Sequence, residues 1–412
     1  MTERLKQMLD GEAHGLSVPP PATDAVLRQG RGLRRRNRLV TGAAGVAAAV
    51  VVGSGVVVLT GGSDNNAAPD PAGSSVGTNP VFSYGNEVFY DGPEHRTAID
   101  DAAVKSLFYT SAGVLVRHGD NSWSDSGGPQ RFSLITPGGD VQPLRLVTEE
   151  TVHASDPDQP YVVYGEAVNG ELQVVVYDVA TDTEEARVSV GRTRETWFPV
   201  ALDGDTVYVQ DRSRDETYAV DWRAGTAEAS DVATTWEVAE GRAATEADGK
   251  PAVVDVAESD VLLTADGPGY FDLSPDGRYA QLVDEEGGGP TFEVYDVATG
   301  EPVTLEGNPF EWGWTADGDM FKVDDNRVTT CDSATGECTV ESYSQPSIPE
   351  PAPITDTASD PVCPDEESLS CYDDEAFLGN CYENPDECEW RETKSITPMT
   401  IETKLAGRAY ES

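Results

Sequence analysis

The stretch Val176-Tyr177-Asp178-Val179-Ala180-Thr181 recurs almost unchanged as Val294-Tyr295-Asp296-Val297-Ala298-Thr299-Gly300. Weaker copies of the pattern contain Asp221, Asp255 and Asp332. The aspartates of successive copies lie about 40 residues apart, the period of a four-stranded propeller blade. Short β-branched and aromatic runs between Gly/Asp turns fill the intervening sequence. The repeat therefore predicts an all-β fold, a β-propeller of about seven four-stranded blades, with six or eight blades as the alternatives.

Each copy of the repeat has the sequence of a β-hairpin. The strand ends at the aspartate, whose carboxylate can accept hydrogen bonds from backbone N–H groups of the turn. A glycine, or a residue near it, then takes the positive-φ position before the next strand begins. A second Asp-Gly turn occurs earlier in several repeats, at Asp203-Gly204, Asp276-Gly277 and Asp317-Gly318. We expect each of these turns to precede a strand in the interior of its blade.

The repeat that contains Asp296 resembles a known blade pattern. The run Leu273-Ser274-Pro275-Asp276-Gly277-Arg278-Tyr279-Ala280, followed by residues 294–301, is similar to blades of WD40-like and TolB-like β-propellers. Such propellers are found as ectodomains of many single-pass bacterial membrane proteins. The resemblance covers roughly residues 81–343 and implies a propeller fold with a general role as an interaction platform. It implies no catalytic residue, and the Trp-Asp dipeptide of the strict WD40 pattern is absent from the repeat turns.

An apolar segment near the N-terminus predicts one membrane crossing. Residues 39–60 carry no charge, and as an α-helix they would span about 33 Å, enough for a hydrocarbon core of about 30 Å. The positive-inside rule then places the N-terminus in the cytoplasm and the rest of the chain outside it. The alternative, a cleaved signal peptide, needs a shorter apolar region and a small-x-small cleavage site. The arginines that set this topology are Arg31, Arg34, Arg35, Arg36 and Arg38.

These features divide the chain into successive parts with different compositions. The predicted parts are a basic cytoplasmic stub at 1–38, a transmembrane helix at 39–60, a flexible linker at 61–80, the β-propeller ectodomain at 81–344, a Pro-rich linker at 345–362 and an acidic Cys-containing tail at 363–412. The net charge of the chain is −46, which repels nucleic acid and anionic lipid. Such a surface suits cations or basic partners, or serves solubility alone.

All six cysteines lie on the predicted outside, where an even number favours three disulfides. Cys331 and Cys338 flank the turn of the last repeat, so a hairpin brings them near bridging distance. We expect this disulfide to stop the last blade from fraying where the ring closes. For the tail cysteines we expect Cys363–Cys371 and Cys381–Cys388, with crossed pairings as the alternative. Zinc is disfavoured, because there is no C-x-x-C pair and no histidine among the cysteines.

The sequence contains no complete catalytic constellation. The four histidines are scattered, and His118 follows a predicted strand at 114–117, where it could face the propeller channel or be an ordinary turn residue. No H-E-x-x-H motif and no EF-hand loop occurs. We therefore expect no cofactor and assign no metal site, with calcium in acidic turns such as Asp203-Gly204-Asp205 as the alternative.

The leading hypothesis is a non-enzymatic binding module, tethered to the membrane through residues 39–60, that binds a protein, peptide or glycan outside the cell. Nucleic acid is not an expected partner. One alternative is a propeller hydrolase acting on envelope polymers, which a central pocket with two close carboxylates or a His–carboxylate pair would favour. Another is a sensor that signals to the 1–38 stub, resembling membrane-bound anti-sigma regulators. The ligand, the pathway and the oligomeric state are not defined by the sequence.

Overall fold

The computed structural model describes residues 79–123, 129–149, 151–232, 238–284, 289–348, 354–361, 390–397 and 400–408. The described residues divide into two units, one of 79–348 with 400–408 and one of 354–361 with 390–397. Within the described ranges there is no helix long and apolar enough to cross a membrane. The predicted stub at 1–38, membrane segment at 39–60 and most of the linker at 61–80 lie outside these ranges, as do the four tail cysteines.

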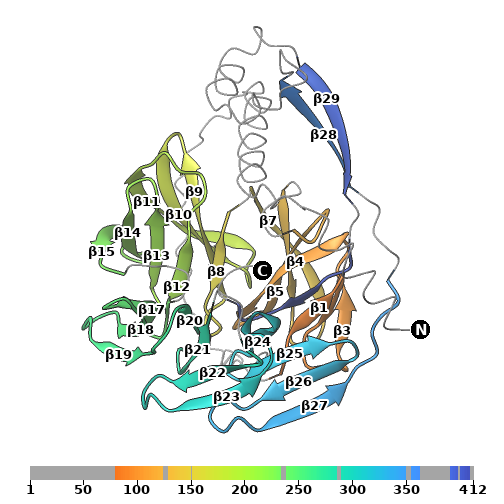
Figure 1. Ribbon diagram of the computed structural model, residues 1–412. Coiled ribbons are helices and arrows are strands. Elements are labelled where there is room, and N and C mark those ends of the chain that lie inside the picture. Colours follow the sequence, from red (N-terminus) through yellow and green to blue (C-terminus); the bar gives the residue numbers. More distant parts are fainter. Residues whose placement is uncertain are drawn as a thin grey trace, which may run out of the picture. The chain divides into compact units, whose positions relative to one another are not determined.

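The unit of residues 79–348 and 400–408 contains seven antiparallel sheets of four strands, arranged around a common centre (Figure 1). Six of these sheets are blades I to VI, in which the strands follow chain order from the inner to the outer edge. Blade I contains β4 (Ala103–Thr110), β5 (Gly113–Gly119), β6 (Gln130–Ile135) and β7 (Val141–Thr148). Blade II contains β8 (His153–Ser155), β9 (Tyr161–Val168), β10 (Glu171–Asp178) and β11 (Thr183–Arg192). Blade III contains β12 (Val200–Asp203), β13 (Thr206–Asp211), β14 (Glu216–Asp221) and β15 (Thr226–Ser230). Blade IV contains β16 (Val238–Ala239), β17 (Arg242–Ala247), β18 (Lys250–Asp255) and β19 (Val261–Thr264). Blade V contains β20 (Tyr270–Leu273), β21 (Tyr279–Val283), β22 (Thr291–Asp296) and β23 (Pro302–Glu306). Blade VI contains β24 (Trp312–Trp314), β25 (Met320–Asp324), β26 (Arg327–Cys331) and β27 (Cys338–Ser342), and a short 3-10 helix, η2 (Pro309–Glu311), precedes β24.

Blade VII joins the two ends of the propeller. Its strand order is β3 (Arg96–Ala98), β2 (Glu87–Phe89), β1 (Phe82–Tyr84) and β30 (Thr403–Leu405). The three-residue strand β30 pairs antiparallel with β1 and forms the inner strand of the blade. This pairing closes the ring and confirms the predicted seven blades of four strands.

The position of β30 changes the predicted division of the chain. The sequence places residues 363–412 in a tail beyond a propeller that ends at residue 344, yet Thr403–Leu405 pair with the first propeller strand. Residues 354–397 are therefore an insertion between blade VI and the closing strand. The described part of this insertion is a hairpin of β28 (Ile354–Pro361) and β29 (Trp390–Thr397), paired antiparallel.

The repeat aspartates have the predicted role. Each ends or directly follows the third strand of its blade, and its carboxylate accepts backbone N–H bonds of 2.8–3.0 Å from the turn. The residue four positions later has a φ between 56° and 72° in every case. The residues with this positive φ are Asp182, Gly225, Ser259, Gly300 and Gly336. The turn is thus set by local chemistry, which is why its period was visible in the sequence.

The core lies between neighbouring blades, where the faces of adjacent sheets pack together. Between blades II and III, Val163, Val174 and Val207 are completely buried in one apolar cluster with Trp222. Burying a side chain of this kind contributes about 1.5–3 kcal/mol. Each blade needs both neighbours to cover its two faces, so closure of the ring by β30 matters for the whole propeller.

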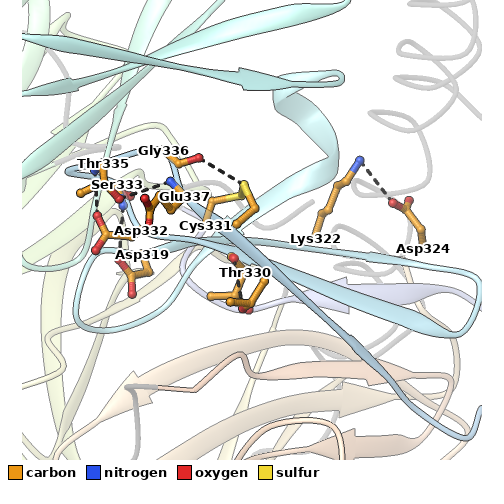
Figure 2. The surroundings of a disulfide bond; sticks show 12 residues. Asp319, Lys322, Asp324, Thr330, Cys331, Asp332, Ser333, Thr335, Gly336 and Glu337 are labelled. Carbon is orange, nitrogen blue, oxygen red and sulfur yellow. Dashed lines mark hydrogen bonds and ion pairs between the residues drawn. A yellow bond between two sulfur atoms is a disulfide. The ribbon is translucent and has the colours of Figure 1, made fainter.

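The disulfide Cys331–Cys338 is present and joins β26 to β27 across the last repeat turn (Figure 2). The two cysteines are directly opposite in the strand register, with their Cα atoms 4.0 Å apart. The pairing confirms the prediction for these two residues. The bridge lies in blade VI, whereas β30 closes the ring in blade VII, so the bridge does not clamp the closing blade as expected.

Candidate binding face at the channel mouth

The turns at one end of the blades carry an unusual density of acids. In an antiparallel sheet the first and third hairpin turns lie at the same end, so both turns of every blade point to one face of the propeller. Along the first turns, each of blades II to VI carries a carboxylate. We call these residues the acidic ring: Asp156, Asp203, Glu240, Asp276 and Asp317.

Three members of the acidic ring line a cavity among the inner strands of the propeller. This cavity of about 110 Å³ is lined by inner strands of blades I to V and by the segment that follows β30. Asp156, Asp203 and Glu240 belong to its wall, together with His153 and Arg408. The space suits an ion, waters or the tip of one side chain, and a larger ligand would have to rest on the turns outside it.

Burial and mutual repulsion perturb the carboxyl groups of the ring. Burial raises the pKa of Asp203, with a further increase from Asp156, although the N–H of Gly241 opposes it. Burial also raises the pKa of Glu240, and the nearby charges of Asp156 and Asp203 add to this effect. Burial raises the pKa of Asp276, against hydrogen bonds from Ser274 and Arg278 that lower it. A cation placed at this mouth would relieve the repulsion among these groups.

Members of the ring also connect one blade to the next. The Asp156 Oδ2 atom accepts a hydrogen bond of 3.2 Å from the N–H of Gly204. Asp203 Oδ2 accepts one of 3.0 Å from the N–H of Gly241. The Asp203 carboxylate also accepts a hydrogen bond from the backbone of Glu240. The same residues can therefore hold the blades together and present negative charge.

Arg408 brings a positive charge into the channel wall. Its Nε atom donates a hydrogen bond of 2.9 Å to the carbonyl oxygen of Trp312. Burial lowers the pKa of Arg408, and the charge of Asp272 opposes this change. The cavity wall therefore combines acidic side chains with the half-buried guanidinium of Arg408.

His118 does not face the channel, contrary to one of the two expectations for it. It lies in β5, where its Nδ1 atom is 2.7 Å from Asp101 Oδ2 and its Nε2 atom is 2.9 Å from Ser133 Oγ. Arg131 makes a bidentate ion pair with the same Asp101 carboxylate. Burial raises the pKa of Asp101, but hydrogen bonds from Arg131, His118 and Ala102 prevail and lower it.

This arrangement has the order of a Ser–His–Asp triad, but Ser133 is enclosed. Ser133 is 3% exposed and His118 is 6% exposed, and neither lines the central cavity. A nucleophile needs space within about 3 Å for the reacting atom. We therefore assign the group a structural role, in which it fixes the segment before β4 to strands β5 and β6.

Among the residues that the structure describes, no group of three or more His, Cys, Asp or Glu side chains is arranged so that it could hold a metal ion. The acidic turns are included in this statement. The Asp203-Gly204-Asp205 turn, for which calcium was the alternative, instead directs Asp203 to Gly241 and Asp205 to Arg223.

Part of this site was visible in the sequence. The Asp-Gly turns at Asp203, Asp276 and Asp317 were recognised as recurring, although their meeting at one mouth was not. Glu240 was missed, because its turn has Glu in place of Asp and lies in a stretch where the repeat is irregular. The signal that could have found it is the acid–glycine pair Glu240-Gly241, which has the spacing of the other inner turns.

Seven four-stranded antiparallel blades around a central channel define the chain as a seven-bladed β-propeller. No family model and no curated protein matches the sequence. Among solved structures, the chain is similar to apo AztD from Citrobacter koseri, with 13% identity over 64% of this chain and 94% of the other and a TM-score of 0.40. It is also similar to the dihydro-heme d1 dehydrogenase NirN (14% identity, 65% and 74% covered, TM-score 0.38) and to TolB from Acinetobacter baumannii (12% identity, 65% and 64% covered, TM-score 0.34). At these scores the propeller assignment rests on the strand pairing of the chain itself.

Proposed function

We propose that the protein is a binding module that holds a basic segment of a partner protein at the acidic ring. The observation that carries the proposal is that the first turns of five successive blades each carry a carboxylate, and that three of these residues, Asp156, Asp203 and Glu240, line one central cavity. Burial, with some repulsion from neighbouring carboxylates, raises the pKa values of Asp203, Glu240 and Asp276, so a positive charge placed beside them would be favourable. A lysine or arginine of the ligand would supply that counter-charge, with its tip reaching into the cavity. In this proposal the propeller lies outside the cytoplasm and is tethered to the membrane through residues 39–60.

The test is a binding measurement on the purified full-length chain in a non-ionic detergent, with a fluorescent hexalysine peptide as the probe. We expect the double variant Glu240→Gln/Asp276→Asn to bind the peptide roughly tenfold more weakly, since each desolvated charge pair contributes about 0.5–1 kcal/mol or more. The matched control is Glu228→Gln/Glu306→Gln, which removes two exposed acids from the outer strands β15 and β23. Equal loss in both double variants would mean non-specific attraction to an acidic surface and would end the proposal.

A second candidate, the envelope-acting hydrolase, is favoured by one observation. Asp203 and Glu240 share one cavity, and a carboxyl group with a raised pKa can act as a general acid. The measurement is release of reducing sugar from a cell-envelope preparation by the full-length chain, compared with Glu240→Gln. Release by the wild type and its loss in the variant would favour the enzyme over the binding module.

A further inference from the structure

Four arginines gather at the end of blade III that is opposite to the acidic ring. Arg192 ends β11 and Arg194 follows it, in the connection to β12, while Arg212 and Arg214 lie in the turn between β13 and β14. All four side chains are exposed. We call them the arginine patch. Because β13 has six residues, its two ends are about 20 Å apart, so the patch and Asp203 are separated by more than a Debye length of about 8–10 Å.

Two contacts bring these segments together. The guanidinium of Arg212 lies over the ring of Trp197, 5.6 Å from its centroid, in a cation–π geometry. The Arg214 Nη1 atom is 3.9 Å from the position that a Cβ atom would have at Gly191, the residue before Arg192. Trp197 is half-buried against the core of blades II and III, so it gives the patch a fixed base.

Several other arginines of the propeller are paired closely with carboxylates. Arg131, Arg145, Arg187 and Arg223 each form an ion pair closer than 3 Å with a carboxylate. In the described part of the chain, no ion pair involves Arg192, Arg194 or Arg212, and Arg214 reaches Asp211 and Glu216 only at 3.8 Å. On a chain with a net charge of −46, three neighbouring arginines without a carboxylate partner are an exception.

Nearby carboxylates are directed elsewhere. Glu171, opposite Arg192 in the strand register, accepts a hydrogen bond from Ser189 Oγ. Asp211 accepts hydrogen bonds from the N–H and the hydroxyl of Ser213 within its own turn. Glu195 and Asp215 lie on the two segments of the patch but form no ion pair with the arginines there. The guanidinium groups of Arg192, Arg194 and Arg212 are thus presented to solvent, whereas Arg214 lies 3.8 Å from Asp211 and Glu216 and donates a hydrogen bond of 3.2 Å to the Tyr218 hydroxyl.

We infer that the arginine patch is a second binding surface, which takes an acidic peptide segment of a partner protein. Arginine presents a planar fork of N–H donors that matches a carboxylate, and arginine with tryptophan dominates protein–protein hot spots. A short acidic segment can lie on the patch without extending over the acidic regions that a net charge of −46 places elsewhere on the surface. A long polyanion or an anionic membrane would extend over those regions and be repelled. The inference goes beyond the acidic ring, because the ligand has the opposite charge and contacts the opposite face.

The test uses the full-length chain in a non-ionic detergent and a fluorescent hexaglutamate peptide. We expect the wild type to bind the peptide and Arg194→Glu/Arg212→Glu to bind it at least tenfold more weakly. The loss should be smaller in Arg194→Lys/Arg212→Lys, which keeps the positive charges but lacks the planar N–H donors of the guanidinium groups. The control is Arg327→Glu, since Arg327 is an exposed arginine of β26 that takes part in none of the described ion pairs. Hexalysine binding should be unchanged or tighter in the patch variant, which separates this surface from the acidic ring.

Several outcomes would overturn the inference. Absence of hexaglutamate binding, or equal loss in Arg327→Glu, would show that the patch is not a site. Binding of phosphatidylglycerol vesicles in place of the peptide, lost in the same double variant, would identify a membrane rather than a protein as the partner. If inorganic phosphate displaced the peptide at concentrations at which sodium chloride does not, the ligand would be identified as a phosphate group.

Discussion

The carboxylate of Asp203, in the first turn of blade III, accepts a 3.0 Å hydrogen bond from the backbone N–H of Gly241, in the first turn of blade IV. Asp156 makes the corresponding contact with Gly204 one blade earlier. In these contacts a carboxylate from one blade satisfies the turn N–H of the next. The acids of the ring therefore have a structural reason to be where they are, in addition to the charge that they offer a ligand.

The first prediction concerns the pH dependence of stability. Because the pKa of Asp203 is raised on folding, the folded state holds this proton more tightly than the unfolded state. The contribution of Asp203 to the unfolding free energy therefore falls as the pH rises from the ordinary aspartate range near 3.8 toward neutrality. Asp203→Asn removes this dependence while its amide oxygen can still accept from Gly241. We expect the variant to gain stability relative to the wild type as the pH rises from 4 to 7.

Chemical denaturation at a series of pH values measures this difference directly. Asp260→Asn is the control, because Asp260 is exposed and lies outside the ring. Its free energy of unfolding should follow that of the wild type at every pH. A constant offset between Asp203→Asn and the wild type, with no pH dependence, would contradict the assignment of a raised pKa to Asp203.

The second prediction concerns the close approach of Asp276 and Gly318, again between neighbouring blades. A Cβ atom at Gly318 would lie 2.8 Å from Asp276 Oδ1, and Gly318 has a φ of 88°. Gly318→Ala should therefore cost the strain of a positive φ, about 1–2 kcal/mol, together with a steric clash. Gly225→Ala is the matched control, because Gly225 has a φ of 69° and no atom lies within 4 Å of its Cβ position.

Urea unfolding of the two glycine variants separates the two costs. We expect Gly318→Ala to be more destabilising than Gly225→Ala, and the excess to shrink when Asp276→Ala is added to the first variant. Equal destabilisation of both single variants would show that the turns of blades V and VI are not in tight contact.

The third prediction concerns the disulfide of blade VI. The bridge closes a loop with a sequence separation of 7, for which the chain-entropy estimate is about 2 kcal/mol. The double variant Cys331→Ala/Cys338→Ala should lose about this much unfolding free energy under oxidising conditions. The difference should become small when both proteins are measured with a reductant, which also opens the wild-type bridge. A difference that persists in full under reduction would assign the loss to side-chain packing of Cys331, which is completely buried.

The sequence predicts those parts of the fold that depend on local chemistry. The turns at Asp178 and Asp296 repeat because each uses its own carboxylate to bond its own backbone. The direction of the His118 side chain was harder to predict from the sequence, because blade I has register shifts between Val104 and Ser106 and between Arg131 and Ser133. Such irregularities break the alternation from which a side chain's direction is inferred.

The closing strand was missed for a different reason. Thr403–Leu405 is three residues long and carries no turn motif of the repeat, and its partner β1 lies near the other end of the chain. No local pattern records such a pairing. The acidic ring is an intermediate case: its Asp-Gly turns were visible one by one, but their meeting at one mouth follows from ring closure.

The last prediction tests that closure. A chain that ends at Thr397 lacks β30 and leaves the inner edge of β1 without its partner strand. It also lacks Ala406, whose N–H bonds to the carbonyl of Val81 and whose side chain is completely buried. Because every blade depends on both neighbours for burial, we expect this chain to lose cooperative thermal unfolding rather than to shed one strand. A chain that ends at Arg408 keeps all of these contacts and should melt like the wild type, by circular dichroism. If the shorter chain retained a cooperative transition near the wild-type temperature, β30 would be dispensable and blades I to VI would be stable as an open ring.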